Sequence, residues 1–183
     1  THAIRTTGIV VALASEARTL THHALPERLT PLADGAALWL SGMGLVAAQR
    51  AAQELVNAGA KALAVFGVAG ALDPSLSSGT LLCPEFVLDE NGERYATDTS
   101  WRTHLQQSSV ANLHASGSLL SVREPLLTAV EKANAHRRFG ALAVDMESAA
   151  VAAIAQRHSL SFISLRAIVD EAADTVPAAL NHS

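Results

Sequence analysis

The ten residues KALAVFGVAG, at positions 61–70, decide the fold that the sequence predicts. After Lys61 the run to Phe66 is apolar without polar alternation, and the glycine-containing segment 67–70 follows at once. A short apolar run that ends at glycine is typical of a strand buried on both faces. We therefore predict a buried strand over residues 61–66 and a loop over residues 67–70, in a sheet that helices cover.

Outward from this stretch, similar apolar runs alternate with amphipathic segments. The other predicted strands cover residues 8–14, 36–41, 142–144 and 161–169, with a weaker candidate at 112–120. One predicted helix starts at Ser15 and runs toward Pro26, and the others cover residues 45–58, 125–135 and 146–158. Residues 80–88 and 93–96 flank Asn91-Gly92, a hairpin signal. The alternation predicts an α/β fold with a mixed central sheet, as a single domain over residues 1–183.

The composition excludes several classes of protein. The net charge is −4 and the longest basic run is Arg137-Arg138, so we expect no nucleic-acid partner. No apolar run reaches the roughly 18 residues of a membrane span, and residues 1–5 do not read as a secretory signal. Cys83 is the only cysteine, and no histidine spacing is typical of a metal site. We therefore expect a cytoplasmic protein without a membrane span or a metal.

The segment Gly42-Met43-Gly44-Leu45-Val46-Ala47 matches the glycine fingerprint of dinucleotide-binding proteins. That fingerprint also needs an acidic residue at the end of the next strand, roughly 20 residues on, to hold the ribose. The next predicted strand ends at Phe66-Gly67 without one. We therefore favour a glycine turn that brings a helix N-terminus to a small anion or water, or a purely structural turn.

Polar groups follow four of the predicted strands. They are Glu16, the segment 67–70, the segment Asp145-Met146-Glu147, and Asp170. Ligands of open α/β sheets bind at the carboxyl ends of the strands, where these residues would meet. Each also has a structural explanation, because Glu16 and Glu147 suit a first helical turn and Asp170 suits a helix cap. The spacing alone does not name a reaction.

Five segments resemble motifs of one family. They are residues 8–16, SGMGLVAA at 41–48, GVAGAL at 67–72, VDMESAA at 144–150 and LRAIVD at 165–170. In this order they resemble the purine nucleoside phosphorylase and methylthioadenosine/S-adenosylhomocysteine nucleosidase superfamily. The resemblance implies a three-layer α/β/α sandwich. Residues 144–150 and 172–177 are most similar to the hopanoid-associated phosphorylase branch.

The resemblance also implies roles in cleaving the bond between a purine and its ribose. Asp170 matches the general acid that protonates the leaving base, and Glu16 matches the carboxylate that activates water. Glu147 matches the acid that holds the ribose hydroxyls, and Met146 matches the side chain packed on the sugar. Arg166 orients or neutralises an acid, or forms a structural ion pair. The remaining residues placed around the substrate are Asp145, Gly67, Val68, Ala69, Met43 and Leu120.

Two departures from the family bear on the nucleophile. Val68 stands where the family has a serine, and Val65 stands where phosphorylases often carry an arginine. Both weaken a phosphate site, and Glu16 would repel phosphate, so we favour hydrolysis. Phosphorolysis stays open, with Arg18 or a partner subunit's arginine holding phosphate as co-substrate. A catalytically weak nucleoside-binding protein is the third hypothesis. No cofactor is expected.

Other departures concern the base and the end of the chain. Val169 replaces the serine before the catalytic aspartate, which removes one hydrogen bond that would orient the acid or the base. The segment 112–121 offers Leu119 and Leu120 but no aromatic residue. Either the base is held more loosely, or the wall comes from another segment such as Phe66, Phe86 or Trp101. Family members continue with a further helix, whereas this sequence stops at Ser183. The tail is expected to be either missing from this sequence or short. The family also implies a homo-oligomer.

Overall fold

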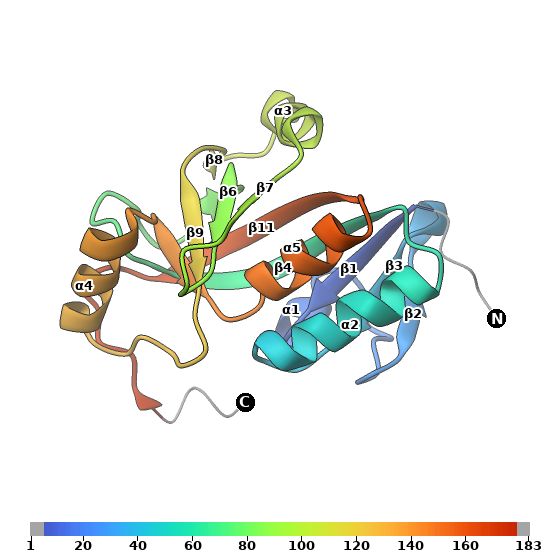
Figure 1. Ribbon diagram of the computed structural model, residues 1–183, viewed down its shortest axis with the longest axis horizontal. Coiled ribbons are helices and arrows are strands. Elements are labelled where there is room, and N and C mark those ends of the chain that lie inside the picture. Colours follow the sequence, from blue (N-terminus) through green and yellow to red (C-terminus); the bar gives the residue numbers. More distant parts are fainter. Residues whose placement is uncertain (1–5, 179–183) are drawn as a thin grey trace.

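Strand β4 (Ala62–Ala71) runs through the middle of the sheet and joins its two halves (Figure 1). The structure is a computed structural model that describes residues 6–178, so our predictions for residues 1–5 and for the end at Ser183 lie outside it. The helices are α1 (Ala14–Ala17), α2 (Leu45–Asn57), α3 (Thr99–Gln107), α4 (Ala129–Phe139) and α5 (Ser148–Arg157), with a 3₁₀ turn at Ala33–Gly35. The other strands are β1 (Thr7–Val11), β2 (Leu29–Pro31), β3 (Ala37–Leu40), β5 (Leu81–Leu82), β6 (Phe86–Leu88), β7 (Arg94–Ala96), β8 (Leu113–His114), β9 (Ser118–Ser121), β10 (Ala143–Asp145) and β11 (Ser161–Asp170). Across residues 6–178, no helix is long and apolar enough to cross a membrane.

The sheet is mixed, as the sequence predicts. Its main path over the described residues runs β2-β3-β1-β4-β10-β9-β6-β7, and β11 pairs with β4 and β5. β1 is parallel to β3 and β4, and β11 is parallel to β4. β10 is antiparallel to the end of β4, and β6 and β7 form the predicted hairpin around Asn91-Gly92. β1 stops opposite Phe66, whereas β4 continues to Ala71, so β1 leaves part of β4 uncovered.

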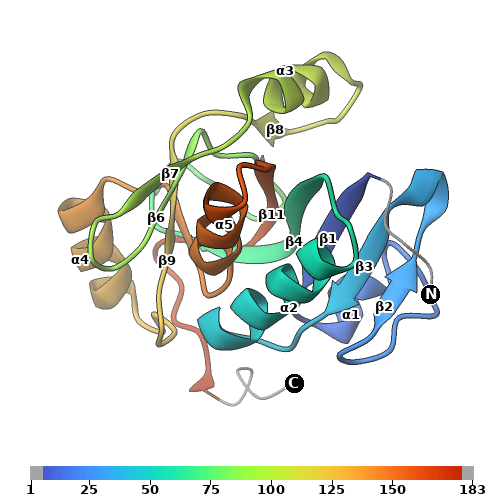
Figure 2. The same cartoon turned by 45° about the vertical axis from the view of Figure 1, so that its right-hand side comes forward.

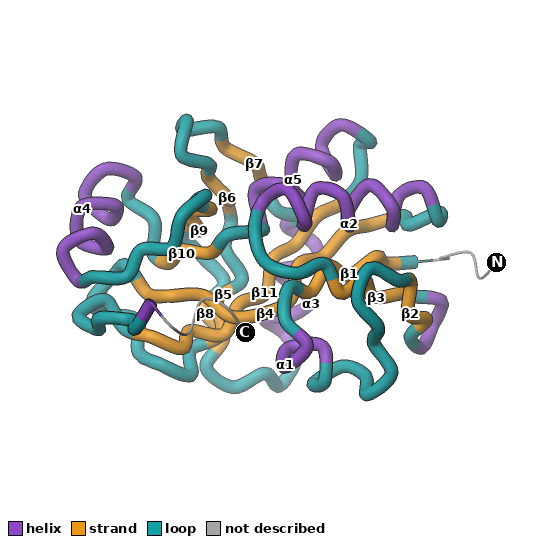
Figure 3. Tube along the Cα trace, turned by 90° about the horizontal axis from the view of Figure 1, so that it is seen from below, coloured by secondary structure: helices purple, strands orange, loops and turns teal. Residues whose placement is uncertain are grey.

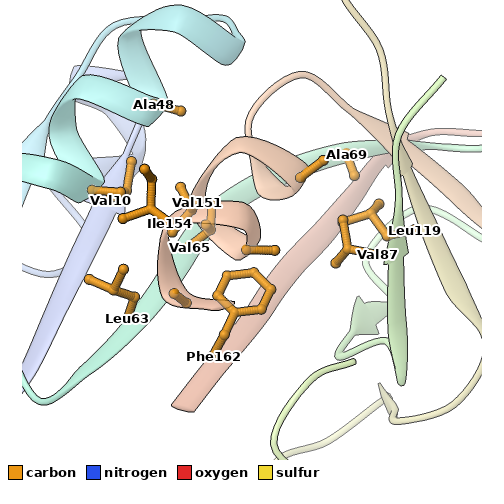
Figure 4. Close-up of a cluster of buried hydrophobic side chains, with 14 of the residues drawn as sticks. Val10, Ala48, Leu63, Val65, Ala69, Val87, Leu119, Val151, Ile154 and Phe162 are labelled. Carbon is orange, nitrogen blue, oxygen red and sulfur yellow. The ribbon is translucent and has the colours of Figure 1, made fainter. Parts of the chain in front are cut away.

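Helices cover both faces of the sheet, which confirms the three-layer α/β/α arrangement. α2 and α5 lie side by side on one face, and α1 and α3 lie on the other (Figure 3). Side chains alternate along β4 accordingly. Leu63 and Val65 pack with α2 and α5, near Ile154 in Figure 4, whereas Ala64 packs on the opposite face with Trp101 of α3. A strand with two buried faces explains the continuous apolar run that the sequence shows.

Helix α2 comes close to the sheet because its buried face is nearly all alanine. Ala48, Ala51, Ala52 and Leu55 recur at helical spacing and are fully buried. On β1, Gly8 faces this helix, and a Cβ there would come within 2.9 Å of Leu55 Cβ. Small side chains on both surfaces therefore let the helix and strand backbones approach. This is how a chain with 4% aromatic residues closes its core.

Helix α4 lies at the end of the molecule opposite β2 (Figure 2). Its Ala135 and Phe139 pack against a separate core cluster that includes Leu120 and Val144 of β9 and β10. The side chain of Thr128 accepts from Glu131 N, and the Glu131 carboxylate accepts from Thr128 N, which closes a capping box. The helix therefore begins at Ala129, and our prediction of a start at Pro125 was four residues too early.

The predicted loop over residues 67–70 was wrong. These residues continue β4, because they keep their pairing with β11 from Gly67 opposite Arg166 to Gly70 opposite Asp170. The predicted strands at 80–88 and 112–120 are each divided in two, by the segment around Pro84 and by the turn at Gly117. Gly117 therefore lies between two strands, whereas Gly67 lies inside β4. The difference is that residues 67–70 keep their pairing with β11.

One further helix was predicted wrongly, and another was not predicted. The helix expected from Ser15 toward Pro26 has only four residues, and Leu13 rather than Ser15 stands at its N-cap. The helix ends at Ala17, and beyond its end Thr19 donates both its N–H and its hydroxyl to the carbonyl of Glu16. Helix α3 was not predicted at all. Only two of its residues, Trp101 and Leu105, are apolar, which is too few to show the periodicity by which helices are found, and Asp98 caps its start.

Candidate active site

A cavity of about 540 Å³ lies where β1, β10 and β11 end beside the uncovered part of β4. Carboxylates from three segments reach it, and apolar side chains of residues 122–127 and 176–177 form one of its walls. The acidic residues that line it are Glu16, Asp145, Glu147, Asp170 and Asp174. The strand ends that we predicted from the sequence therefore meet in one place.

Two backbone N–H groups hold Glu16 at the cavity. Its Oε2 accepts a hydrogen bond from Leu13 N at 2.8 Å, and its Oε1 accepts from Val68 N at 3.0 Å. No β1 residue pairs with Val68, so the carboxylate binds the N–H that a longer β1 would have covered. Gly67 provides the space, since a Cβ there would lie 2.5 Å from Glu16 Oε1 and 2.6 Å from Arg166 Nη1. Glu16 is thus buried and held in a defined orientation.

The glycine turn before α2 binds a carboxylate of the protein itself. Gly44, the N-cap of α2, donates its backbone N–H to Glu147 Oε2 at 3.0 Å. The φ of Gly44 is +100°, a conformation that favours glycine. A helix N-terminus attracts negative charge, and Glu147 supplies it. The small anion that the sequence left open is therefore the side chain of Glu147.

Arg166 is a fully buried cation among three carboxylates. Its Nη2 lies 2.7 Å from Asp145 Oδ2 and 3.4 Å from Glu147 Oε1. Burial lowers the pKa of the Arg166 guanidinium, but the carboxylates of Asp145, Glu147 and Glu16 outweigh this effect and raise it. One cation thus faces three acids, which leaves this side of the cavity negative.

Glu147 responds to this excess of negative charge. Burial, helped by the Asp145 and Glu16 carboxylates and opposed by Arg166 and the Gly44 N–H, raises the pKa of Glu147 to about 7. The side chain therefore changes its charge near neutral pH. An acid poised in this way inside a cavity is typical of a functional site.

Asp145 is occupied by contacts within the protein. Its Oδ1 accepts from Ser121 Oγ at 2.5 Å, and its Oδ2 accepts from Ser148 Oγ at 2.5 Å and pairs with Arg166. Ser148 Oγ also lies 2.9 Å from Ser164 Oγ. These contacts hold Arg166 beneath the cavity. Asp145 touches the cavity, but its hydrogen bonds fit a supporting role better than direct substrate binding.

Asp170 ends β11 and enters the cavity through a bulge. Ile168 pairs with Ala69 and Asp170 pairs with Gly70, so Val169 is the extra residue, and it is 53% exposed. A Cβ at Gly70 would lie 2.8 Å from Asp170 Oδ2, so only glycine leaves room for the carboxylate. On its other side, Asp170 Oδ2 lies 2.5 Å from Lys132 Nζ of α4.

The cavity brings together most of the residues that the sequence singled out. Glu16, Glu147 and Asp170 line it with Met146, Met43, Val68, Ala69 and Asp145. Three predicted residues lie elsewhere. Gly67 and Arg166 pack behind the acids, and Leu120 is fully buried in the core beside α4.

None of the proposed aromatic residues lines the cavity wall. Phe66 packs with the cluster near α1, Trp101 packs under α3, and Arg94 lies 3.3 Å above the ring of Phe86. Aliphatic side chains take that place, because the chain crosses the cavity after β9 and again after β11. The apolar residues of this wall are Val122, Pro125, Leu126, Leu127, Val176 and Pro177.

The sequence analysis missed Lys132. The sequence contains a pattern that could have indicated it. Lys132, Ala135 and Phe139 recur at i, i+3 and i+7 and so share one face of α4. Ala135 and Phe139 are core residues of that face. A lysine on an apolar helix face needs a buried acceptor, and this pattern indicates one.

The chemistry of the cavity follows from its side chains. Among residues 6–178, those that line the cavity include five acids but no lysine, arginine or histidine. Thr175 is the only one of these lining residues with a hydroxyl group. Over the same residues, no group of three or more His, Cys, Asp or Glu side chains could hold a metal ion. Such a cavity stabilises positive charge and can give or take protons, and its described residues supply little to bind an anion.

A family model described as the phosphorylase superfamily matches residues 8–183. No curated protein sequence matches the chain.

Solved structures with the same fold include three bacterial nucleoside-cleaving enzymes. The 5′-methylthioadenosine/S-adenosylhomocysteine nucleosidase of Campylobacter jejuni is 22% identical, with a TM-score of 0.78 over 91% of this chain and 86% of that one. The futalosine hydrolase of Helicobacter pylori is 20% identical, with a TM-score of 0.75 over 94% and 88% of the two chains. A mutant of the Helicobacter pylori nucleosidase with 5′-methylthioadenosine in its active site is 20% identical, with a TM-score of 0.81 over 97% and 89%. At these identities the likeness shows the fold.

Proposed function

The chain belongs to the phosphorylase superfamily, and from that premise we propose that it hydrolyses the N-glycosidic bond of a purine nucleoside of the adenosine type. The proposal takes residues 1–183 as one catalytic domain. It needs no cofactor. The observation that carries it is the acidic lining of the cavity. Five carboxylates line it, whereas the two cations beside them, Arg166 and Lys132, pair with Asp145 and Asp170 and are not among the lining residues.

This charge favours water over phosphate as the nucleophile. Breaking the bond between C1′ and the base nitrogen leaves positive charge on the ribose, and nearby carboxylates stabilise such charge. A phosphate ion would bring at least one negative charge among these acids and would find Thr175 as its one side-chain donor among the described lining residues. Water meets no such repulsion. Phosphorolysis therefore becomes an outcome of the experiment below.

The three acids divide the reaction between them. Glu16 takes a proton from water as the water oxygen bonds to C1′. The electron pair of the broken bond goes to the base, and the Asp170 carboxyl gives a proton to a nitrogen of that base. Glu147 accepts hydrogen bonds from the ribose hydroxyls, and Met146 packs beside the sugar. The aliphatic wall of residues 122–127 and 176–177 lies beside Asp170 and packs on the flat base.

The substrate can be identified by testing a panel of adenine nucleosides. The printed names of the structural neighbours supply 5′-methylthioadenosine, S-adenosylhomocysteine and futalosine. The similarity to the hopanoid-associated branch adds a lipid-linked adenosine. We also propose a cytoplasmic homo-oligomer, as the resemblance implies, which light scattering after size-exclusion chromatography tests.

Replacing the proposed acid tests the reaction. Asp170→Asn keeps the size of the side chain but has no carboxyl proton to give, so release of adenine should fall by about 100-fold or more. Asp34→Asn changes an exposed aspartate in the same way and should leave the rate unchanged. Product chromatography gives the rate of each variant. Normal release by Asp170→Asn would overturn the assignment.

A further inference from the structure

Lys132 is buried completely, yet its ammonium group is fully hydrogen-bonded. Its Nζ lies 2.5 Å from Asp170 Oδ2, 2.8 Å from the carbonyl oxygen of Glu171 and 3.1 Å from that of Asp174. An ammonium group has three N–H donors, so three oxygens satisfy it. No donor is left to reach a substrate. Any effect of Lys132 on the reaction therefore passes through Asp170 and the backbone beside it.

The two oxygens of Asp170 are not equivalent. Lys132 Nζ donates to Oδ2, whereas no hydrogen bond to Oδ1 is found among residues 6–178. The carboxyl is 24% exposed and lines the cavity. An oxygen that accepts a short hydrogen bond from a cation is a poor place for a proton, since two hydrogens would face each other. A proton carried by Asp170 therefore belongs on Oδ1.

We propose that Lys132 is the positioning residue that directs the acid of Asp170, by binding Oδ2 so that Oδ1 carries the proton to the base. This inference rests on the proposed function, in which Asp170 is the general acid. The step is the transfer of the Oδ1 proton to a base nitrogen, as that nitrogen takes the electron pair of its bond to C1′. The negative charge left on Asp170 then faces the ammonium, which stabilises it.

The same ammonium also fixes the wall beside the base. By binding the carbonyls of Glu171 and Asp174 it holds the turn after β11, and Val176 N donates to the carbonyl of Leu127 at 2.8 Å. The capping box of Thr128 and Glu131 anchors the turn of α4 from which Lys132 extends. The Lys132 side chain thus fixes the position of Asp170 relative to the wall segment.

The test compares the wild type with Lys132→Met, which keeps most of the length of the side chain and removes its charge and its N–H donors. The substrates are purine ribosides whose bases differ in acidity, such as adenosine and the ribosides of 6-chloropurine and 2,6-dichloropurine. A base that is a better leaving group depends less on protonation. The quantity measured is the slope of log kcat/KM against the pKa of the free base, with Asp170→Asn and the double variant beside it. Lys61→Met makes the same change at the only other lysine, which is exposed.

Lys132→Met is expected to lose about 100-fold on adenosine and far less on the dichloropurine riboside, so the slope becomes steeper. Asp170→Asn should give a similar slope, and the double variant should lose no more than Asp170→Asn alone. Lys61→Met should match the wild type. If Lys132→Met does not fold, Lys132→Leu carries the same test, because it also removes both the charge and the N–H donors.

Two results would overturn the inference and are distinguishable. An equal loss on every riboside, or no loss, with Asp170→Asn still impaired would contradict the role of Lys132 and leave the proposed function standing. Full activity of Asp170→Asn, or no turnover of any riboside by the wild type, would contradict the proposed function, and this inference with it.

Discussion

The backbone N–H of Gly44 donates to Glu147 Oε2 at 3.0 Å, although the two residues are 103 positions apart. This bond joins the turn before α2 to the turn before α5, on one side of the cavity. The helix N-terminus that resembled a dinucleotide site is thereby occupied by an acid of the protein. That acid is the one that we assign to the ribose, and its charge depends on pH close to neutrality.

Stability should therefore fall as pH rises through about 7. Burial raises the pKa of Glu147 from 4.5 to about 7 in the folded protein, so folding favours the protonated acid. The stabilisation is complete below pH 4.5 and is lost as pH rises through about 7. Glu147→Gln, which mimics the protonated form, should match the wild type near pH 5 and be more stable at pH 8. Urea unfolding at both pH values measures this, and an equal difference at both would contradict it.

Replacing Glu16 should slow the reaction without weakening binding. Glu16→Gln keeps an oxygen for one backbone N–H but cannot take a proton from water, so kcat should fall by about 10²- to 10⁴-fold while KM changes little. Steady-state kinetics on the best nucleoside gives both constants. Glu54→Gln, on the exposed face of α2, is the matched control. A kcat close to that of the wild type would remove Glu16 from the mechanism.

Gly67 should not tolerate a side chain. In Gly67→Ala the new Cβ would meet Glu16 and Arg166, and such overpacking costs about 1–3 kcal/mol of unfolding free energy. The displaced Glu16 should also lower the activity of the protein that remains folded. Gly79→Ala has nothing within 4 Å of its Cβ and should keep normal activity per folded molecule. Equal activity of the two variants would mean that the position of Glu16 is unimportant.

Breaking the buried ion pair should destabilise the fold. Asp145→Asn removes the negative partner 2.7 Å from the fully buried Arg166 and should cost about 3–5 kcal/mol. The exposed Asp34→Asn should cost nothing measurable. Thermal or urea unfolding compares the two. A loss within the error of the control would show that Glu147 and Ser148 suffice to hold Arg166.

The sequence predicted the parts of the fold that have a clear apolar pattern. The apolar runs at 161–169 and 61–66 marked β11 and the first half of β4, and Asn91-Gly92 marked the hairpin. It did not reveal that residues 67–70 continue β4, because their pairing with Arg166 and its neighbours is a tertiary contact. Helix α3 was not predicted because its sequence contains only two apolar residues, Trp101 and Leu105.

The residues of the candidate site also differ in whether the sequence could predict them. Glu16, Glu147 and Asp170 could be placed from the sequence because each follows a strand, and the carboxyl ends of strands meet at one edge. Lys132 lies 38 residues from Asp170 and reaches it only through the packing of α4. Leu120 was assigned to the cavity because the resemblance places the wall against the base in the segment 112–121, but its side chain packs in the core cluster beside α4.

The central claim is that water is the nucleophile, and one measurement tests it directly. The protein is incubated with the nucleoside that it cleaves fastest, once without phosphate and once with phosphate at 50 times the nucleoside concentration. Both products are then separated and identified. An acidic cavity without cationic lining residues in the described chain predicts free base and free ribose at the same rate in both. Turnover only with phosphate, with ribose 1-phosphate as the sugar product, would contradict the account.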